Sequence, residues 1–110
     1  MRQVAINELS DIEVKAMEEY LKINAAPGAI QGVYWFPLPD KVLAAAQAGH
    51  EKCGPFVFAI EIVRDTVIFE LLVRSSSNLH CTCTSYATAE QRQYLLDFFD
   101  RMVLETRVKG

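Results

Sequence analysis

Apolar and polar positions follow a strand-like pattern from Val57 to Val73, on both sides of Arg64-Asp65. A two-residue connection at that point makes Val63 face Thr66 across an antiparallel pair. The pairs on one face are then apolar on both sides: Ile62–Val67, Ile60–Phe69, Phe58–Leu71 and Phe56–Val73. The pairs on the other face are mixed: Glu61–Ile68, Ala59–Glu70 and Val57–Leu72. Because a buried face selects its own register, the pattern predicts a β-hairpin with one buried side.

The chain continues with Ser75-Ser76-Ser77-Asn78, whose composition is typical of a solvated loop. The stretch from Leu79 to Tyr86 is predicted to form the third strand of a meander. If Leu79 faces Val73, alternation along the strand puts Cys81 and Cys83 on the apolar face. On the mixed face, the same register places His80, Thr82 and Thr84 beside Glu61 and Glu70.

Helical patterns occur near both ends of the chain. Ser10 to Asn24 is predicted to be a helix, and Ser10 with Glu13 forms a capping-box pattern at its start. A second helix is predicted from Thr88, with Gln91 completing its capping box, to about Thr106. The apolar arc of this last helix exceeds the roughly 100° that one sheet would cover. We therefore expect it also to contact the first helix, the segment after residue 40 or a second subunit.

The segment between the first helix and the hairpin is predicted to hold one strand and one short helix. Ile30 to Phe36 has the aromatic and β-branched content of a strand, with Gly32 as a candidate bulge. Residues 40–48 are rich in alanine and are predicted to form a helix that ends at Gly49. The predicted fold class is α+β in a single domain, residues 1–110. A twisted antiparallel sheet, made of a three-strand meander and one further strand, carries the N- and C-terminal helices on one face.

Composition narrows the classes of partner. The net charge is −3 without a lysine or arginine cluster, so nucleic acid and membrane are not expected partners. The order helix, three strands, helix resembles the double-stranded RNA-binding domain. That family has a lysine cluster where this chain has Thr88-Ala89-Glu90-Gln91-Arg92, so the resemblance implies element order and not RNA binding. We expect a cytoplasmic protein, because residues 1–9 lack an apolar signal segment and three cysteines without an export signal do not indicate disulfides.

Cysteine and histidine fall into two short patches, 50–53 and 80–83. Zinc sites are built from such residues, and Cys81 and Cys83 could share an ion with Cys53 and His50 if the loop of residues 50–53 folds over the sheet. The alternative interpretation is that the strand cysteines are small core residues, since free cysteine is among the most buried residue types. Cys53 is also a candidate reactive thiol beside Lys52.

Two further groups of residues are candidate sites. Glu61, Glu70 and His80 on the mixed face could bind a divalent cation or act in acid–base chemistry, or could belong to a solvated or interfacial sheet face. The apolar residues of that face, among them Ile68 and Leu72, favour cover by a second copy or another protein. Tyr34, Trp35 and Phe36 are candidate interface anchors, or core residues of an edge strand whose three rings cannot all point the same way.

Three functions remain open on the sequence. The first is a small binding or assembly domain without catalysis, acting as a homodimer and needing no cofactor. The second is a zinc-binding protein using His50, Cys53, Cys81 and Cys83. The third is a small enzyme using Glu61, Glu70 and His80. We expect no catalysis, because the sequence contains no catalytic or phosphate-loop motif. The sequence does not indicate which small molecule, if any, the protein binds.

Overall fold

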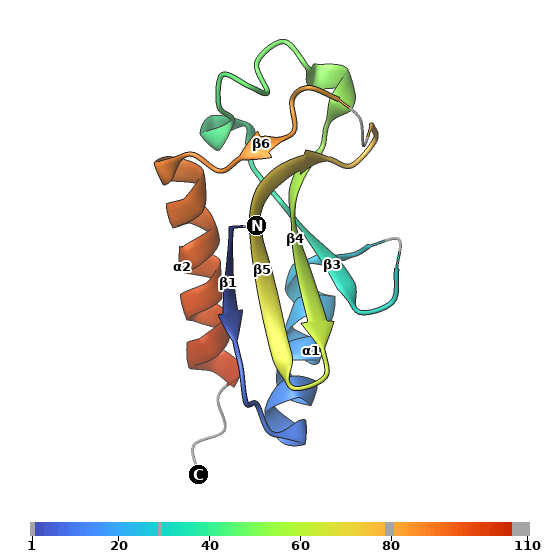
Figure 1. Cartoon of the computed structure of the whole chain (residues 1–110), viewed down its shortest axis with the longest axis vertical. Coiled ribbons are helices and arrows are strands. Elements are labelled where there is room, and N and C mark those ends of the chain that lie inside the picture. Colours follow the sequence, from blue (N-terminus) through green and yellow to red (C-terminus); the bar gives the residue numbers. More distant parts are fainter. Residues whose placement is uncertain (1, 29, 79–80, 107–110) are drawn as a thin grey trace.

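A computed structural model describes residues 2–28, 30–78 and 81–106. Its elements are β1 (Gln3–Ile6), α1 (Asp11–Asn24), β2 (Ala26–Pro27), β3 (Val33–Pro37), β4 (Phe56–Val63), β5 (Thr66–Ser75), β6 (Ser85–Tyr86) and α2 (Ala89–Thr106), with short 3₁₀ helices η1 (Asp40–Val42) and η2 (Glu51–Cys53). One sheet has the strand order β1-β5-β4-β3-β2, with every pair antiparallel, and β6 also pairs with β5. The α+β fold class is confirmed (Figure 1).

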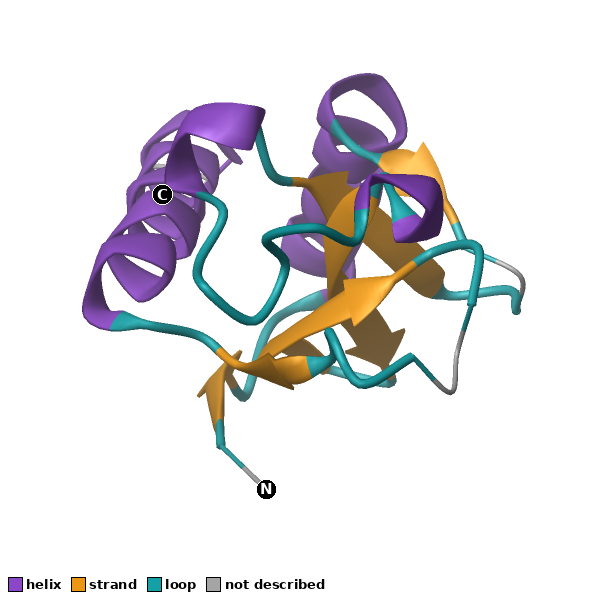
Figure 2. Cartoon of the chain, turned by 90° about the horizontal axis from the view of Figure 1, so that it is seen from above, coloured by secondary structure: helices purple, strands orange, loops and turns teal. Residues whose placement is uncertain are grey.

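Both helices lie on one side of the sheet (Figure 2). The capping boxes at Ser10 and Thr88 are present: Glu13 N–H donates to Ser10 Oγ, and Gln91 N–H donates to Thr88 Oγ1. The core between helices and sheet consists mainly of Met17 and Leu21 from α1, Leu95, Phe98 and Met102 from α2, and Tyr34, Phe36, Phe58, Ile60, Val67, Phe69 and Val73 from the strands. As the wide apolar arc predicted, α2 contacts more than the sheet, because its cover includes α1 and η1.

The predicted pairing of the β4–β5 hairpin is correct near the turn, but the register differs from the prediction farther from the turn. Val63 faces Thr66, Ile62 faces Val67 and Ile60 faces Phe69, as expected. Beyond that point Phe58 faces Val73 and Phe56 faces Ser75, so the predicted Phe58–Leu71, Phe56–Val73, Ala59–Glu70 and Val57–Leu72 pairs are wrong. The cause is an irregularity that gives β5 two residues more than β4 between these pairs. The shift is even, so the inward side chains remain inward.

The predicted third strand is mostly absent. Of the described residues 81–86, only β6 pairs with β5, through Leu72–Tyr86 and Val73–Ser85, and Cys81 and Cys83 lie in the turn before it. The predicted pairing of Leu79 with Val73 is therefore wrong, since Val73 faces Ser85, while Leu79 itself lies outside the described residues. Most of this edge of β5 belongs instead to β1, where Gln3 to Ile6 pair with Glu70 to Val67. A four-residue strand at the start of the chain has no local signal, because its partner lies far along the sequence.

The predicted helix over 40–48 is also wrong. Only η1 and a series of turns form there, with Gln47 N–H bonded to Ala44 O and His50 N–H bonded to Gln47 O. Alanine-rich stretches this short gain little from helix propensity alone, and tertiary contacts decide their conformation. The strand predicted from Ile30 starts at Val33, because Gly32 at φ +87° belongs to the turn before it.

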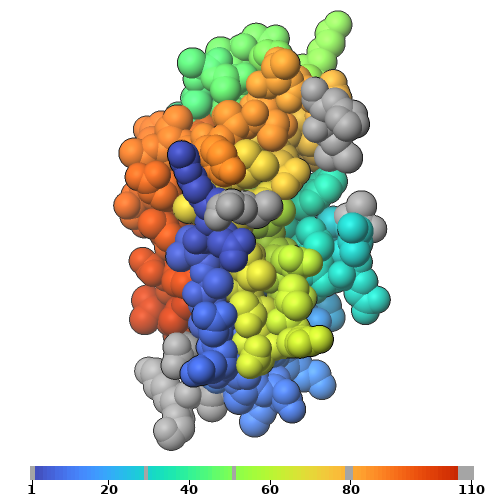
Figure 3. Space-filling model, in the orientation of Figure 1, coloured from blue at the N-terminus to red at the C-terminus, as the bar shows by residue number. Residues whose placement is uncertain are grey.

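The opposite face of the sheet is not covered by a helix in the described part of the chain. Figure 3 shows β1, β5 and β4 open on this side. Its apolar side chains are half-buried by their neighbours: Val33, Trp35, Ala59, Ile68 and Leu72. This is the mixed face that the alternation in the sequence predicted.

Candidate metal centre

Four side chains with metal-binding chemistry meet at one end of the sheet. The ligand atoms of His50, Cys53, Cys81 and Cys83 all lie within 4.8 Å of one another. Cys53 Sγ lies 3.1 Å from Cys81 Sγ, and Cys81 Sγ lies 3.2 Å from His50 Nδ1. A tetrahedral zinc ion with Zn–S bonds of about 2.3 Å places its sulfurs about 3.8 Å apart, within this range of separations.

Two segments far apart in the sequence supply these ligands. His50 and Cys53 come from the turn that ends in η2, and Cys81 and Cys83 come from the turn before β6. Figure 1 shows both segments at the upper end of the molecule, beyond the ends of the helices. A metal ion bound here would therefore join two segments that belong to neither of the α-helices nor to a strand of the sheet.

Local backbone geometry presents the histidine and the first cysteine together. Gly49 has φ +80°, a conformation that L residues with a side chain rarely adopt, and it turns the chain directly before His50. Cys53 N–H then donates to His50 O at 2.9 Å, which closes one 3₁₀ turn. The side chains of His50 and Cys53, three positions apart, therefore lie on the same side of that turn.

The two remaining cysteines are held by a second turn. Thr84 N–H donates to Cys81 O at 3.2 Å, and Cys83 N–H points at Cys81 Sγ at 3.4 Å. A backbone N–H directed at sulfur stabilises a thiolate. The prediction that Cys81 and Cys83 share one side was made for a strand, but in the structure a turn brings their sulfurs together.

Ser75 connects the Cys53 loop to Asn78, whose carbonyl in turn accepts from Cys81 N–H at 3.1 Å. Its hydroxyl donates to Cys53 O and accepts from Asn78 N–H at 2.9 Å, and the side chain is only 1% exposed. Ser77 Oγ also donates to Lys52 O at 3.3 Å. The expectation of a solvated loop is therefore wrong for Ser75. Its position, two residues after inward-facing Val73, is the signal in the sequence that could have identified it.

Two buried glutamines, Gln47 and Gln91, also help to hold the turn that carries Cys81 and Cys83. Gln47 Nε2 donates to Cys83 O at 2.8 Å, and Gln91 Nε2 donates to Gln47 Oε1 at 3.0 Å. Gln91 is at the same time the capping-box residue of α2, where its Oε1 accepts from Thr88 N–H. Through Gln47, the ligand segment is therefore connected to the N-terminus of α2. Sequence reasoning identified the cap and missed this second role.

Cys81 is the thiol that ionises most readily. Hydrogen bonds from the Cys83 side chain and backbone N–H, and from the Cys53 thiol, lower the pKa of Cys81 to about 7. The pKa of Cys53 is raised, first by its hydrogen bond with Cys81. Burial raises the pKa of Cys83 to about 12. The three sulfurs by themselves favour one shared thiolate, whereas a bound cation favours thiolates on all three.

Part of the core interpretation also holds. Cys83 is fully buried and belongs to the hydrophobic core, while Cys53 and Cys81 are half-buried and pack against it. The sulfur cluster thus lies at the edge of the core, with apolar residues on one side. This is a common environment for structural metal sites, because an apolar surround lowers the local dielectric.

The aromatic segment divides between the two faces, as its alternation predicted. Tyr34 and Phe36 are 7% and 6% exposed and face the helices, where the Phe36 ring stacks on Phe98 at a centroid distance of 4.0 Å. Trp35 is half-buried on the uncovered face, opposite Ala59. Only Trp35 of the three is placed to act as an anchor for a partner.

The predicted site of Glu61, Glu70 and His80 can be followed only for its two carboxylates, which lie on the uncovered face of the sheet. Glu61 is exposed opposite Ile68, and Glu70 is bonded to Arg74, whose Nη2 lies 2.7 Å from Glu70 Oε1. His80 lies outside the described residues. Within the described ranges, no cluster of three metal-binding side chains includes Glu61 or Glu70.

Comparison with protein-family models, with curated proteins and with solved structures found no match for this chain. Among the described residues, neither helix combines the length and the apolar character needed to cross a membrane. The four-residue cluster is therefore the feature from which a function can be argued.

Proposed function

We propose that this protein binds one zinc ion through His50, Cys53, Cys81 and Cys83. The observation that carries the proposal is the convergence of one imidazole nitrogen and three sulfurs within 4.8 Å of one another. Three thiolates and one imidazole form a ligand set that zinc prefers over harder cations such as magnesium or calcium.

The number of ligands favours a structural role for the ion. Catalytic zinc sites usually have three protein ligands and an open position, whereas structural sites are closed by four. Four ligands are available here, and the segments that carry them make their remaining contacts through turns and the Ser75 and Gln47 hydrogen bonds. The ion would stabilise the end of the sheet rather than act on a substrate. We also propose a cytoplasmic location, where the three cysteines, free in the structure, stay reduced.

Native mass spectrometry of untagged protein, purified without chelator, tests this proposal. We expect a mass increase of about one zinc ion per chain. Cys81→Ser should abolish stoichiometric zinc, because Cys81 lies next to both Cys53 and His50. Lys52→Ala is the matched control, since Lys52 is exposed in the same loop and offers no ligand. Protein that carries no metal even after reconstitution with zinc would refute the proposal.

Self-association through the uncovered sheet face is a second candidate function. Trp35, Ile68 and Leu72 supply half-buried apolar surface there, and the charge of Glu70 is matched by Arg74. Apolar surface of this kind favours contact with a second copy of the chain. The same native mass spectrum reports subunit number, so zinc binding and assembly are tested independently.

A further inference from the structure

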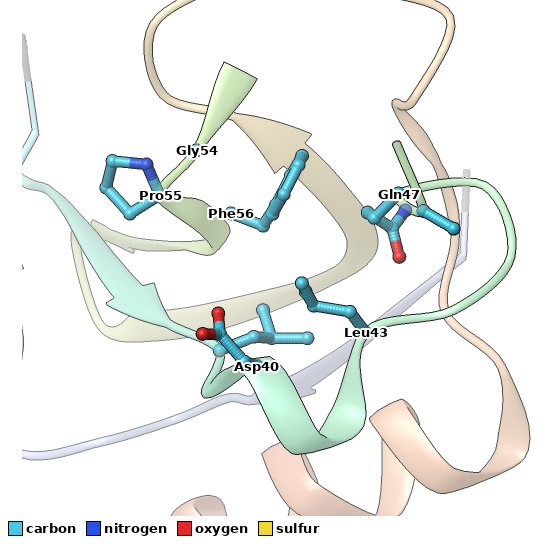
Figure 4. A pocket seen from close by; sticks show the side chains of 8 residues that line it. Asp40, Leu43, Gln47, Gly54, Pro55 and Phe56 are labelled. Carbon is cyan, nitrogen blue, oxygen red and sulfur yellow. The ribbon is translucent and has the colours of Figure 1, made fainter. Parts of the chain in front are cut away.

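A pocket of about 460 Å³ lies beside the metal centre, between the segment after β3 and the start of β4. Figure 4 shows Asp40 and Leu43 on one side of this pocket and Gly54, Pro55 and Phe56 on the other. Its volume falls within the range of about 300–1,000 Å³ that is typical of small-molecule sites. The complete lining is Leu38, Asp40, Leu43, Gln47, Ala48, Gly54, Pro55 and Phe56.

Backbone hydrogen bonds hold the two walls in place. Leu38 N–H donates to Phe56 O at 2.9 Å, which joins one wall to the other. Leu43 N–H donates to Asp40 O at 3.1 Å, which fixes the 3₁₀ turn that carries both residues. Leu38 and Phe56 are themselves core residues, 7% and 4% exposed. The pocket is therefore preformed, so a ligand would not need to order it.

The two polar side chains of the lining, Gln47 and Asp40, differ in whether they can still bond to a ligand. Gln47 is saturated: Oε1 accepts from Ala44 N–H and from Gln91, while Nε2 donates to Cys83 O and Ser85 Oγ. Asp40, by contrast, is exposed, and its carboxylate has no ion pair or hydrogen bond to any described residue. Its carboxylate points into the space between the walls (Figure 4). One unpaired carboxylate at the exposed edge of a lining with apolar side chains favours a cation carried on an apolar body.

We propose that this pocket binds a small organic ammonium compound with an aromatic or branched aliphatic body. The ammonium group pairs with the Asp40 carboxylate, and the apolar body lies against Leu43, Pro55 and Phe56. The proposal goes beyond zinc binding and does not depend on it, since no lining residue is a metal ligand.

Titrations followed by amide chemical shifts test the proposal with three probes of one shape. The probes are 2-phenylethylamine, 2-phenylethanol and 3-phenylpropionate, which carry a positive, no and a negative charge. We expect the amine to bind tightest, at millimolar concentration, with shifts at Leu43 and Phe56, and the acid to bind weakest. Asp40→Asn should weaken binding of the amine about 2-fold to 5-fold and leave binding of the alcohol unchanged, because only the amine loses a charge-assisted hydrogen bond at this exposed carboxylate.

Asp100→Asn is the matched control, because it removes the same charge from an exposed site on α2, outside the lining. Ala48→Phe, at an exposed lining position, should block all three probes by filling the pocket while leaving the fold intact. Equal affinity of amine and alcohol for the unmodified protein would overturn the proposal. So would binding that survives Ala48→Phe, or a loss on Asp100→Asn equal to that on Asp40→Asn. Repeating the titrations with zinc-depleted protein separates failure of this pocket from failure of the metal proposal.

Discussion

Gln47 and Gln91 are joined by a 3.0 Å hydrogen bond between buried side-chain amides, 44 residues apart in the sequence. Gln91 Nε2 also donates to Val42 O at 3.0 Å, so one amide group reaches both the turn segment and its glutamine. Both side chains are almost fully buried, at 2% and 0% exposure. A buried polar network of this kind stabilises only while every member keeps its partner.

Gln91→Leu is therefore expected to destabilise the protein by about 2 kcal/mol, because it leaves Gln47 Oε1 and Val42 O short of a donor and Thr88 N–H without its side-chain acceptor. Urea unfolding measures this change. Gln93→Leu is the control, since Gln93 is exposed on the same helix and bonds only to Asp97; it should cost less than about 0.5 kcal/mol. Equal costs for the two variants would contradict a role for the buried network.

Ser75→Ala should weaken zinc binding without removing a ligand. Ser75 bonds both Cys53 O and Asn78 N–H, and Asn78 O accepts from Cys81 N–H, so its loss breaks one connection between the two ligand loops. Loss of such an outer contact typically lowers metal affinity about 10-fold to 100-fold. Competition with a chromogenic zinc chelator measures the affinity. Thr82→Ala, exposed in the turn between Cys81 and Cys83, should leave it unchanged.

Tyr20→Phe should cost about 0.5–1 kcal/mol at neutral pH, because Tyr20 Oη donates to Glu105 Oε2 at 2.9 Å and so ties α1 to α2. Burial, followed by Glu105, raises the pKa of Tyr20 in the folded protein. A raised pKa means that the contribution is fully present below the unfolded value of about 10 and is lost as pH rises through the folded value. Urea unfolding of both proteins at pH 7 and at alkaline pH checks this. A stability difference that does not shrink at high pH would exclude the hydroxyl as its source.

Ile68→Glu should give a monomer if the uncovered sheet face joins two copies. The substitution places a second carboxylate in the middle of that face, opposite Glu61 on β4, without touching the core, so an interface there would bury two like charges. Light scattering at micromolar concentration measures the mass of both proteins. Ile12→Glu, on exposed surface of α1, is the control and should not change subunit number. If the unmodified protein is itself a monomer, assembly through this face is refuted.

Zinc removal should loosen one end of the molecule and leave the rest folded. Residues 50–53 and 81–84 are expected to exchange amide hydrogens faster after chelation, whereas β4, α1 and the middle of α2 keep their protection, because these elements are held by the core. Hydrogen exchange read by mass spectrometry resolves the two regions. Unchanged exchange in both ligand loops would show that the ion does not hold them.

Local signals account for what the sequence predicted well. Both helices begin at capping boxes, whose contacts span three residues, and the Arg64-Asp65 turn sets the pairing closest to it. The features that sequence reasoning missed depend on distant partners. β1 pairs with β5, and residues 81–84 of the predicted third strand instead form a turn bonded to Gln47.

The candidate site was predicted by residue type rather than by geometry. Cysteine and histidine at 50–53 and 81–83 suggested zinc chemistry, and the structure brings them together, but through two turns instead of a strand and a loop. Ser75 and Gln47 were not foreseen in this role, because a buried hydroxyl or amide resembles a surface residue until its partners are known.

The two additional residues in β5 affect how this sheet tolerates changes in length. Because the pairing beyond Ile60–Phe69 is displaced by an even number, Phe58 and Val73 still point toward the helices. Removing two residues between Phe69 and Val73 would restore continuous pairing without exchanging the faces of the strand. Removing one residue would turn the following side chains outward. Ser75 would be among them and would lose its hydrogen bond to Cys53 O. Homologues of this chain should therefore differ in length at this point by pairs of residues, and deletion libraries should recover folded protein in the same pattern.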